Sequence, residues 1–383
     1  MTSDIPKPIT VGILGGGQLA RMTAIAAYRL GLRIAILDPE TESPAGQIAH
    51  LKVVGSLNDV SSLEILARKS DIITLENEFV DAPLIKHLES IGASVYPTAY
   101  TVGLIQDKLL QKQILETSGI GVPHFMGVSS HEDLYKAGER FGWPLVLKTR
   151  RNGYDGRGNA LVCGPHEVLS AWRNLGGAKR TLMVEAFVPF KKELAVMVAR
   201  STKGEIATYP VVETIQRDHI CHIVKAPADV SPSVCEKAAM IARRSIEAVK
   251  GIGIFGVEMF LLDDNHVLIN ELAPRPHNSG HYTIEACITS QFENHLRAIL
   301  GLPLGSPSMI IPAAVMVNLL GSHDGVASVY GFENALRIPG VNVHIYGKKL
   351  TRPGRKMGHI TVLGQDIAET LVKAIRAASF IYF

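Results

Sequence analysis

Short apolar runs alternate with amphipathic stretches along the N-terminal quarter of the chain. The runs Thr10–Leu14, Arg33–Leu37, His50–Val54 and Asp71–Leu75 are rich in apolar residues, which is typical of strands covered on both faces. Between the first two runs, Gln18–Leu30 repeats its apolar residues with helical spacing. Strands that alternate with helices favour a parallel, doubly wound α/β sheet of the Rossmann-like kind.

The pattern changes after a polar amphipathic helix predicted over Asp107–Ser118. Two predicted strands, Pro144–Lys148 and Thr181–Glu185, belong to a second α/β unit. Two longer apolar runs, Gly256–Leu262 and His266–Leu272, are separated only by Asp-Asp-Asn. Because Asp and Asn tolerate the backbone angles of a tight turn, this pair of runs predicts a β-hairpin.

These elements divide into three expected domains. A Gly- and Pro-rich segment, 300–307, separates the hairpin unit from the C-terminal strands and a final helix. We therefore expect an α/β domain at 1–102, a central domain at 103–307 and a small domain at 308–383, a mixed α/β and α+β chain. Residues 379–383 are unusually apolar, which indicates either a shortened chain or docking on a neighbour.

Composition places the chain among ordinary globular proteins. Its 383 residues are 46% hydrophobic and 20% charged, and 39 Lys and Arg against 36 Asp and Glu give a net charge of +3. We therefore expect no nucleic-acid or membrane partner. Four cysteines without a CxxC pair and an N-terminus without a signal sequence favour a cytoplasmic protein. His219, Cys221 and His222 lack zinc-site spacing and favour an ordinary strand.

A glycine loop joins the first predicted strand to its helix. Gly15-x-Gly17-x-x-Ala20 satisfies the dinucleotide fingerprint, and Asp38 follows where an acid that binds ribose would lie. Small residues and a helix N-terminus suit an anionic ligand, so NAD(P), another ligand and a purely structural turn are all compatible with the loop. Gln18 argues against the dinucleotide, because its amide can bind a polar ligand.

A second glycine-rich segment, Gly153–Asn159, follows the strand that ends in Lys148. Its exposed N–H groups and the nearby lysine suit a polyphosphate, although the Walker A spacing is absent and a plain glycine-rich hairpin is the alternative. Glu185 closes the next strand, and residues 185–188 can offer backbone groups and an apolar side to an adenine ring. Glu193 can accept ribose hydroxyls, with simple solvation as the alternative for both acids.

Two carboxylates, Glu258 and Glu271, interrupt the apolar strands of the predicted hairpin. Their side chains can face the same side, and burying two like charges is costly unless a cation joins them. Together with Asn270 they suit Mg²⁺ that bridges phosphates, whereas pairing with nearby Arg or Lys is the alternative. The loop that follows, 273–282, is dense in polar donors and suits a substrate site, or else a satisfied polar loop.

A basic cluster near the C-terminus holds five Lys and Arg residues within 348–356. Arginine side chains of such a cluster can bind a phosphate monoester with two parallel hydrogen bonds. A solvated basic loop is the alternative, and a nucleic-acid contact is disfavoured because interleaved aromatic residues are missing.

The order of these features resembles the ATP-grasp superfamily, and more closely its N5-carboxyaminoimidazole ribonucleotide synthetases. The resemblance includes the synthetase part of the fungal phosphoribosylaminoimidazole carboxylase and covers about residues 10–365. It is carried by the motifs GGGQLARM (15–22), GYDGRGN (153–159), NELAPRPHNSGHYT (270–283) and RPGRKMGH (352–359). It implies an ATP-grasp fold whose central domain has a lid subdomain at about 122–188.

The resemblance implies a ligase of de novo purine biosynthesis that carboxylates 5-aminoimidazole ribonucleotide. Bicarbonate and ATP would form carboxyphosphate, and the products would be N5-carboxyaminoimidazole ribonucleotide, ADP and phosphate. It also implies Mg²⁺, with Mn²⁺ as a substitute, and a homodimer, and it makes NAD unnecessary. The alternatives are another ATP-grasp ligase such as formate-dependent glycinamide ribonucleotide transformylase, an NAD-binding oxidoreductase, and a non-catalytic ATP-binding module.

The resemblance also implies sets of site residues. The ATP-binding set is Lys108, Lys148, Gly153, Tyr154, Asp155, Gly156, Arg157, Gly158, Glu185, Ala186, Phe187, Val188, Glu193, Gln216, Asn270 and Glu271. The substrate-binding set is Gln18, Leu19, Glu76, Tyr154, Asp155, Arg275, His277, Asn278, Lys348 and Arg355. The catalytic set is Asp155, Arg275 and Lys348, with Asp155 orienting the amine or moving its proton, and the metal ligands are Glu258 and Glu271. Ala20 and Gln216 replace a Gly and a His that many members carry.

Overall fold

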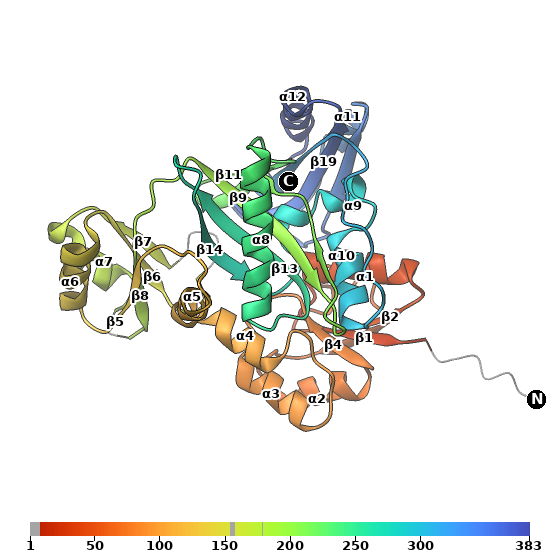
Figure 1. The fold of residues 1–383 in the computed structure, drawn as a ribbon. Coiled ribbons are helices and arrows are strands. Elements are labelled where there is room, and N and C mark those ends of the chain that lie inside the picture. Colours follow the sequence, from red (N-terminus) through yellow and green to blue (C-terminus); the bar gives the residue numbers. More distant parts are fainter. Residues whose placement is uncertain (1–7, 154–157, 178) are drawn as a thin grey trace, which may run out of the picture.

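The computed structural model describes residues 8–153, 158–177 and 179–383 (Figure 1). Its N-terminal part is a parallel four-stranded sheet in the order β3-β2-β1-β4, as predicted. The strands are β1 (Thr10–Leu14), β2 (Arg33–Asp38), β3 (Leu51–Val54) and β4 (Ile72–Leu75). The helices are α1 (Gln18–Arg29), α2 (Val60–Arg68), α3 (Ala82–Ser90) and α4 (Ala99–Gln106). Because parallel strands end at the same edge, the loops after β1 and β4 meet there.

Helix α5 (Lys108–Thr117) connects this sheet to the rest of the chain and lies where a helix was predicted. Asp107 caps the helix by accepting two backbone N–H groups of its first turn. The same carboxylate accepts hydrogen bonds of 2.9 and 2.6 Å from the Arg150 guanidinium. One buried side chain therefore fixes the start of α5 against the strand that carries Lys148.

A separate antiparallel sheet, in the order β5-β8-β6-β7, forms the arm at the left of Figure 1. Its strands are β5 (Phe125–Val128), β6 (Leu145–Thr149), β7 (Asn159–Val162) and β8 (Leu182–Ala186). Its helices are α6 (His131–Phe141), η1 (Pro165–Glu167) and α7 (Val168–Asn174). The arm has an apolar core of its own, and it occupies the range expected for the lid.

The largest sheet has nine strands and continues from the central region into the C-terminal region. Eight strands follow the order β14-β13-β9-β11-β12-β15-β19-β17, and β10 pairs with β9. The strands are β9 (Lys192–Arg200), β10 (Ile206–Thr208), β11 (Val212–Arg217), β12 (Ile220–Ala226), β13 (Gly253–Leu261), β14 (Val267–Ala273), β15 (Ala313–Leu320), β17 (Val341–Ile345) and β19 (Lys356–Gly364). Since β12 pairs directly with β15, the C-terminal strands extend the central sheet without a break.

The predicted hairpin is present as β13 and β14, with Asn265 in its turn at a φ of 62°. The hairpin of β11 and β12 was not predicted as such. Its turn places Asp218 and His219 at positive φ without the Asn-Gly or Asp-Gly pair that marks such turns in a sequence. Strand β9 is almost continuously buried, so its sequence lacks the alternation of a half-exposed strand.

Helix α8 (Pro232–Ala248) packs against the central strands of the sheet (Figure 1). The remaining elements are η2 (Asn278–Gly280), α9 (Thr283–Ala286), α10 (Gln291–Ile299), α11 (Phe332–Leu336), α12 (Ile367–Ala378), β16 (Gly325–Val326) and β18 (Leu350–Thr351). The apolar tail packs within its own domain, because Ile381 and Phe383 are buried in a core with β15 and β19. No helix in the described ranges is long and apolar enough to cross a membrane.

His295 on α10 joins the N-terminal sheet to the nine-stranded sheet. Its Nδ1 accepts the Ile254 N–H at 3.1 Å, so the proton of the neutral ring lies on Nε2, which is 2.8 Å from Thr74 Oγ1. Burial lowers the pKa of His295 to about 4, and the ring is therefore neutral near pH 7. The loop after β4 is thus held at a fixed position against the larger sheet.

Candidate active site

Two carboxylates hold the first glycine loop in place. The Gly16 N–H donates to Asp38 at 2.7 Å, and the Leu19 N–H donates to Glu76 at 3.3 Å. A Cβ atom on Gly17 would lie 2.1 Å from Glu76 Oε1, so only glycine fits at this approach. The Asp38 carboxylate thus accepts a hydrogen bond from the loop itself. The hypothesis of a bound dinucleotide needs the same carboxylate for the ribose hydroxyls, so this contact argues against it.

Glu76 and Lys348 bring charges from two different domains to this loop. Burial raises the pKa of Glu76, while the loop N–H groups and the Lys348 ammonium favour its ionised form. Burial, followed by repulsion from Arg355, lowers the pKa of Lys348 to about 7. The Lys348 ammonium donates to the Lys356 carbonyl at 2.6 Å. A lysine whose charge changes near pH 7 therefore lies close to the glycine loop.

The basic loop that contains Lys348 rests on the N-terminal domain. The Gln47 side-chain amide donates to the Gly347 carbonyl at 2.7 Å, which joins segments 300 residues apart. The Arg355 guanidinium donates to the Leu350 carbonyl at 2.7 Å, within the same loop. The structure thus brings Glu76, Lys348 and Arg355 of the expected substrate-binding set close to the start of α1, where Gln18 and Leu19 lie.

A second charged centre lies where Glu185 on β8 meets two lysines. Lys148 lies 2.7 Å from Glu185 Oε2, and Lys112 lies 3.3 Å from Oε1. Lys112 also donates to the Ile269 carbonyl at 3.0 Å. Burial opposes ionisation of Glu185, but the two ammonium groups lower its pKa to about 2. The site prediction did not include Lys112, although it lies one helical turn after Lys108 on the same face of α5.

The hairpin carboxylates Glu258 and Glu271 are directly opposite each other in the antiparallel register, and hence on one face of the sheet. Lys108 forms an ion pair with Glu271. Burial, together with the carboxylates of Glu271 and Glu193, raises the pKa of Glu258 to about 7. A carboxyl group whose ionisation is opposed by two neighbouring carboxylates is a suitable ligand for a divalent cation.

Several residues of the predicted sets converge on Glu258. The Asn270 amide donates to its Oε2 at 3.4 Å, and His277 Nε2 lies 3.3 Å from its Oε1. Glu193 lies on the neighbouring strand and accepts a hydrogen bond from Gln216, while burial raises the pKa of Glu193. The glutamine at the position of a usual histidine therefore still contacts a carboxylate of the site.

Arg275 begins the polar loop after β14 and forms a buried ion pair that was not predicted. Glu78, in the loop after β4, accepts from Arg275 Nε and from Nη2, the latter at 3.0 Å. Burial opposes the charge of Arg275, but Glu78, Glu76 and Glu271 together raise the pKa of its guanidinium. In the sequence, only the closely spaced acids of Leu-Glu-Asn-Glu (75–78) could have indicated that Glu78 belongs to the site.

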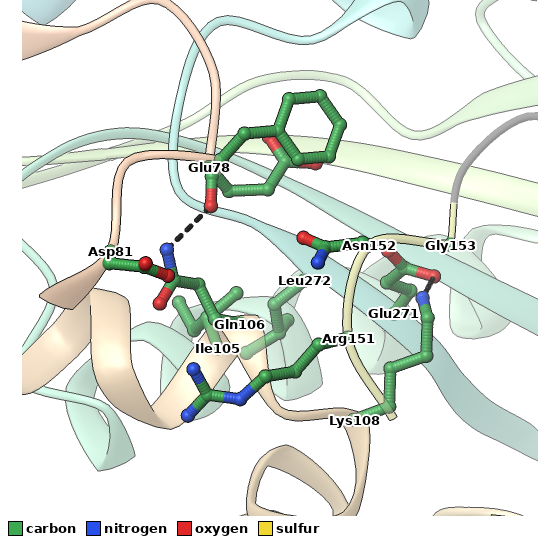
Figure 2. Close-up of a pocket in the computed structure, with 11 residues that line it drawn as sticks. Glu78, Asp81, Ile105, Gln106, Lys108, Arg151, Asn152, Gly153, Glu271 and Leu272 are labelled. Atoms are coloured by element: carbon green, nitrogen blue, oxygen red, sulfur yellow. Dashed lines mark hydrogen bonds and ion pairs between the residues drawn. The ribbon is translucent and has the colours of Figure 1, made fainter. Parts of the chain in front are cut away.

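Figure 2 shows a cleft lined by three of these charged groups, with Glu78 and Gln106 on one side and Lys108 and Glu271 on the other. Its empty space, including the part that is open to solvent, is about 450 Å³. Gly153 lies at its rim, where the chain leaves the described residues (Figure 2). The start of the second glycine loop is therefore adjacent to the Lys108–Glu271 pair.

Four predicted site residues, Tyr154, Asp155, Gly156 and Arg157, lie outside the described residues. Gly158 follows them at a φ of 85°, and a Cβ atom there would lie 2.4 Å from the Thr149 hydroxyl.

The segment 186–188 follows strand β8. Its Ala186 and Phe187 N–H groups donate to the carbonyls of residues 124 and 144, and the Phe187 ring is 42% exposed.

No group of three His, Cys, Asp or Glu side chains within the described ranges is arranged to hold a metal ion. Cys221 is buried, and it is followed by His222 on the other face of β12. Asn278 and His277 start the short helix η2, and Asn278 is buried beside the Cys221 thiol. Cys221 and His222 thus lie on a strand, as the ordinary-strand interpretation expected, whereas His219 lies in the turn before β12.

Three family models match successive parts of the chain. A ribonucleotide synthetase preATP-grasp domain matches residues 9–106, and an ATP-grasp domain matches residues 113–292. A phosphoribosylaminoimidazole carboxylase C-terminal domain matches residues 314–373. The predicted ATP-grasp fold with its N-terminal and C-terminal domains is confirmed by these matches.

Named relatives are similar over nearly the whole chain. A phosphoribosylaminoimidazole carboxylase of Ogataea methanolica is 46% identical over 94% of this chain and 67% of its own length. An N5-carboxyaminoimidazole ribonucleotide synthase of Synechococcus elongatus is 42% identical over 92% of this chain and 89% of its own length. The chain spans about two thirds of the length of the fungal carboxylases that it matches, and somewhat less for several of them.

A solved structure shows the same arrangement of all three domains. The N5-carboxyaminoimidazole synthase of Aspergillus clavatus, in complex with ADP and 5-aminoimidazole ribonucleotide, is 38% identical with a TM-score of 0.89. The similarity covers 97% of this chain and 98% of that one.

Proposed function

This chain belongs to the N5-carboxyaminoimidazole ribonucleotide synthase family of ATP-grasp ligases, and from this premise we propose that it carboxylates 5-aminoimidazole ribonucleotide with bicarbonate and ATP. The products would be N5-carboxyaminoimidazole ribonucleotide, ADP and phosphate, with carboxyphosphate as the intermediate of this step in purine biosynthesis. The position of Arg275 carries the proposal, because Glu76 on the glycine-loop side and Glu271 on the lysine side both act on its guanidinium. Arg275 therefore lies between a group of residues suited to phosphoryl transfer and a group suited to a phosphate monoester.

The proposed ATP half supplies positive charge and fixed positions, which are the main requirements of phosphoryl transfer. Lys108 and Lys148 are both held by carboxylates, so their ammonium groups are oriented before a nucleotide enters. The backbone of 153–158 and of 185–188 would contact phosphates and base, and Glu193 with Gln216 would contact the ribose. These roles follow from the resemblance.

Magnesium fits the hairpin carboxylates. Burial, followed by the carboxylates of Glu271 and Glu193, raises the pKa of Glu258, and a divalent cation would favour its ionised form. We propose that Glu258 and Glu271 hold Mg²⁺, with Mn²⁺ as a substitute that has similar oxygen ligands. The cation would neutralise charge on the phosphates, and Lys108 would keep Glu271 ionised and in place.

The proposed substrate half is the first glycine loop with the basic loop above it. Gln18, the Leu19 N–H and Glu76 would contact the aminoimidazole, and Lys348 with Arg355 would hold its phosphate. Tyr154 and Asp155, which lie outside the described residues, are proposed to contact the ribonucleotide, with Asp155 orienting the amine or moving its proton.

Bicarbonate or carboxyphosphate would lie near Arg275, His277 and Asn278. His277 Nδ1 accepts the Ser279 N–H at 3.4 Å, which places the ring proton on Nε2, toward Glu258. Burial and the charge of Arg275 lower the pKa of His277 to about 3, so the neutral ring acts as a hydrogen-bond donor and not as a second cation.

The proposed reaction is tested by ADP release from the purified chain with ATP, Mg²⁺, bicarbonate and 5-aminoimidazole ribonucleotide. We expect release that depends on the ribonucleotide and equals the amount of carboxylated product. Parallel reactions with glycinamide ribonucleotide and formate test the transformylase alternative, and a titration with NAD(H) tests the oxidoreductase alternative. ADP release without any dependence on 5-aminoimidazole ribonucleotide would contradict the proposal.

A cytoplasmic location and a homodimer are further parts of the proposal. The four cysteines are free thiols, as a reducing compartment would keep them. Sedimentation equilibrium of the purified chain would distinguish the expected dimer from a monomer.

Lys348 predicts how the affinity for the ribonucleotide changes with pH. Because its pKa is about 7 in the free protein, the ammonium loses its charge as pH rises above 7, while the phosphate stays a dianion. We expect the Kd of 5-aminoimidazole ribonucleotide, measured by isothermal titration, to rise roughly ten-fold between pH 7 and pH 9. Lys348→Arg keeps the charge and should flatten this profile, whereas a flat profile in the unchanged chain would contradict the assignment.

A further inference from the structure

We propose that Glu78 is a positioning residue that orients Arg275 for the planar anion of the reaction. The inference rests on the proposed function and deepens it, since Glu78 belongs to neither of the residue sets expected from the sequence. It lies in the loop after β4, in the N-terminal domain, whereas Arg275 follows β14 in the ATP-grasp domain. The pair therefore joins two domains at the cleft.

The contact between the two side chains is bidentate and shielded from water. Glu78 accepts from Nε and Nη2 of Arg275, and both side chains are only 18% exposed. Burial opposes the charge of Glu78, yet Arg275 lowers the pKa of this carboxyl below its usual range. Glu78 is therefore ionised, and a charged carboxylate restricts the rotation of the guanidinium about its long side chain.

The remaining N–H groups of Arg275 define what it can bind. A guanidinium has five N–H groups, of which Glu78 takes two and the Pro276 carbonyl takes one, at 3.3 Å from Nη1. Within the described part of the chain, one N–H on each terminal nitrogen is left for a ligand, and a guanidinium can present one N–H of each terminal nitrogen side by side. That pair matches two oxygens of a planar anion such as bicarbonate or the carboxyl end of carboxyphosphate.

Glu78 is itself fixed by its backbone. The Gln106 side-chain amide donates to the Glu78 and Val80 carbonyls, each at 2.6 Å, and Figure 2 shows the first of these contacts. Two residues earlier, Glu76 accepts the Leu19 N–H of the glycine loop. The short segment 76–78 thus sets the distance between the proposed ribonucleotide site and the anion site.

The test compares Glu78→Gln with the unchanged chain in steady-state kinetics. The amide keeps the shape but loses the charge, so Arg275 is no longer held in one orientation. We expect the KM for bicarbonate to rise roughly ten- to hundred-fold, while the KM for ATP changes less than about two-fold. We also expect more ADP to be released per carboxylated product, because misplaced carboxyphosphate is lost to water.

A double-mutant cycle shows whether Glu78 acts through Arg275. The effects of Glu78→Gln and Arg275→Lys should be strongly non-additive. Arg275→Lys already removes the guanidinium that Glu78 orients, so the loss of Glu78 should have little further effect. Glu64→Gln is the matched control, because Glu64 pairs with Arg68 on the exposed surface of the same domain and should leave every KM unchanged.

Four results would overturn the inference. Additive effects in the cycle, or an equal loss for all three substrates with a lower melting temperature, would show that Glu78 has only a structural role. If the unchanged chain releases no ADP with ribonucleotide and bicarbonate, the proposed function fails and the role of Glu78 fails with it. If that reaction proceeds and Glu78→Gln keeps the normal KM for bicarbonate, the role of Glu78 alone is wrong.

Discussion

Replacing Glu271 by glutamine is expected to lower magnesium-dependent turnover about a thousand-fold and to leave the fold intact. The substitution removes one of two proposed metal ligands and also the partner of Lys108. Glutamine has the same shape, and the Glu271 side chain is 36% exposed, so the strand pairing of β14 is not disturbed. A thousand-fold loss corresponds to about 4 kcal/mol of transition-state stabilisation, which is a reasonable size for a metal ligand.

The measurement is kcat with saturating ATP over a range of Mg²⁺ concentrations. Asp263→Asn is a suitable control, because Asp263 is an exposed carboxylate in the turn of the same hairpin. We expect this control to match the unchanged chain. Near-normal turnover of Glu271→Gln at ordinary Mg²⁺ concentrations would show that the metal is held elsewhere.

Replacing Glu185 by glutamine is expected to lower the free energy of unfolding by about 3–5 kcal/mol. Glu185 is the shared counter-ion of Lys112 and Lys148, and all three side chains are largely buried. Without its charge, two ammonium groups remain close together in a region with little water. Lys112 keeps only its bond to the Ile269 carbonyl, so the penalty of burying its charge is no longer offset.

Urea unfolding of Glu185→Gln measures this effect, with Glu247→Gln as the control. Glu247 pairs with Arg243 on the exposed face of α8, and loss of such a surface pair costs about 0.5 kcal/mol or less. A similar loss of unfolding free energy in both variants would show that the buried Glu185–lysine centre stabilises the fold no more than a surface ion pair does. We also expect the KM for ATP to rise, because Lys148 would lose the contact that orients it.

The same centre predicts an acid dependence of stability. The pKa of Glu185 is about 2 in the folded state and lies below its ordinary value of 4.5, so its stabilising effect is fully present above pH 4.5. As pH falls from 4.5 toward 2, the unfolded state takes up the proton first and this contribution is lost. Glu185→Gln should therefore show a weaker fall in stability across that window than the unchanged chain.

Local patterns were enough to predict the elements that form the two halves of the site. The parallel first sheet, the helix 108–117 and the hairpin with its opposed acids all depend on spacing within a few residues, and each is present in the structure. The order of the sheet depends instead on pairings between distant strands. The contact of β12 with β15 joins residues about ninety positions apart, and no local pattern reports it.

The unpredicted site residues have the same explanation. Lys112 and Glu78 act through partners on other domains or strands, and their neighbours in the sequence give little sign of this. The resemblance identified the residues expected to touch ligands, because motifs record those directly. It did not identify the side chains that hold them, since such contacts appear only when the chain is folded.

The unbroken pairing of β12 with β15 has a mechanical consequence. The C-terminal strands and the hairpin of Glu258 and Glu271 belong to one sheet, so we expect them to move as one rigid body without a hinge between them. The arm of β5–β8 has its own sheet, and side-chain contacts such as Asp107 with Arg150 and Lys112 with Glu185 connect it to α5. We therefore expect the distance between the basic loop at 348–356 and the hairpin carboxylates to stay constant, while movement of the arm changes the width of the cleft.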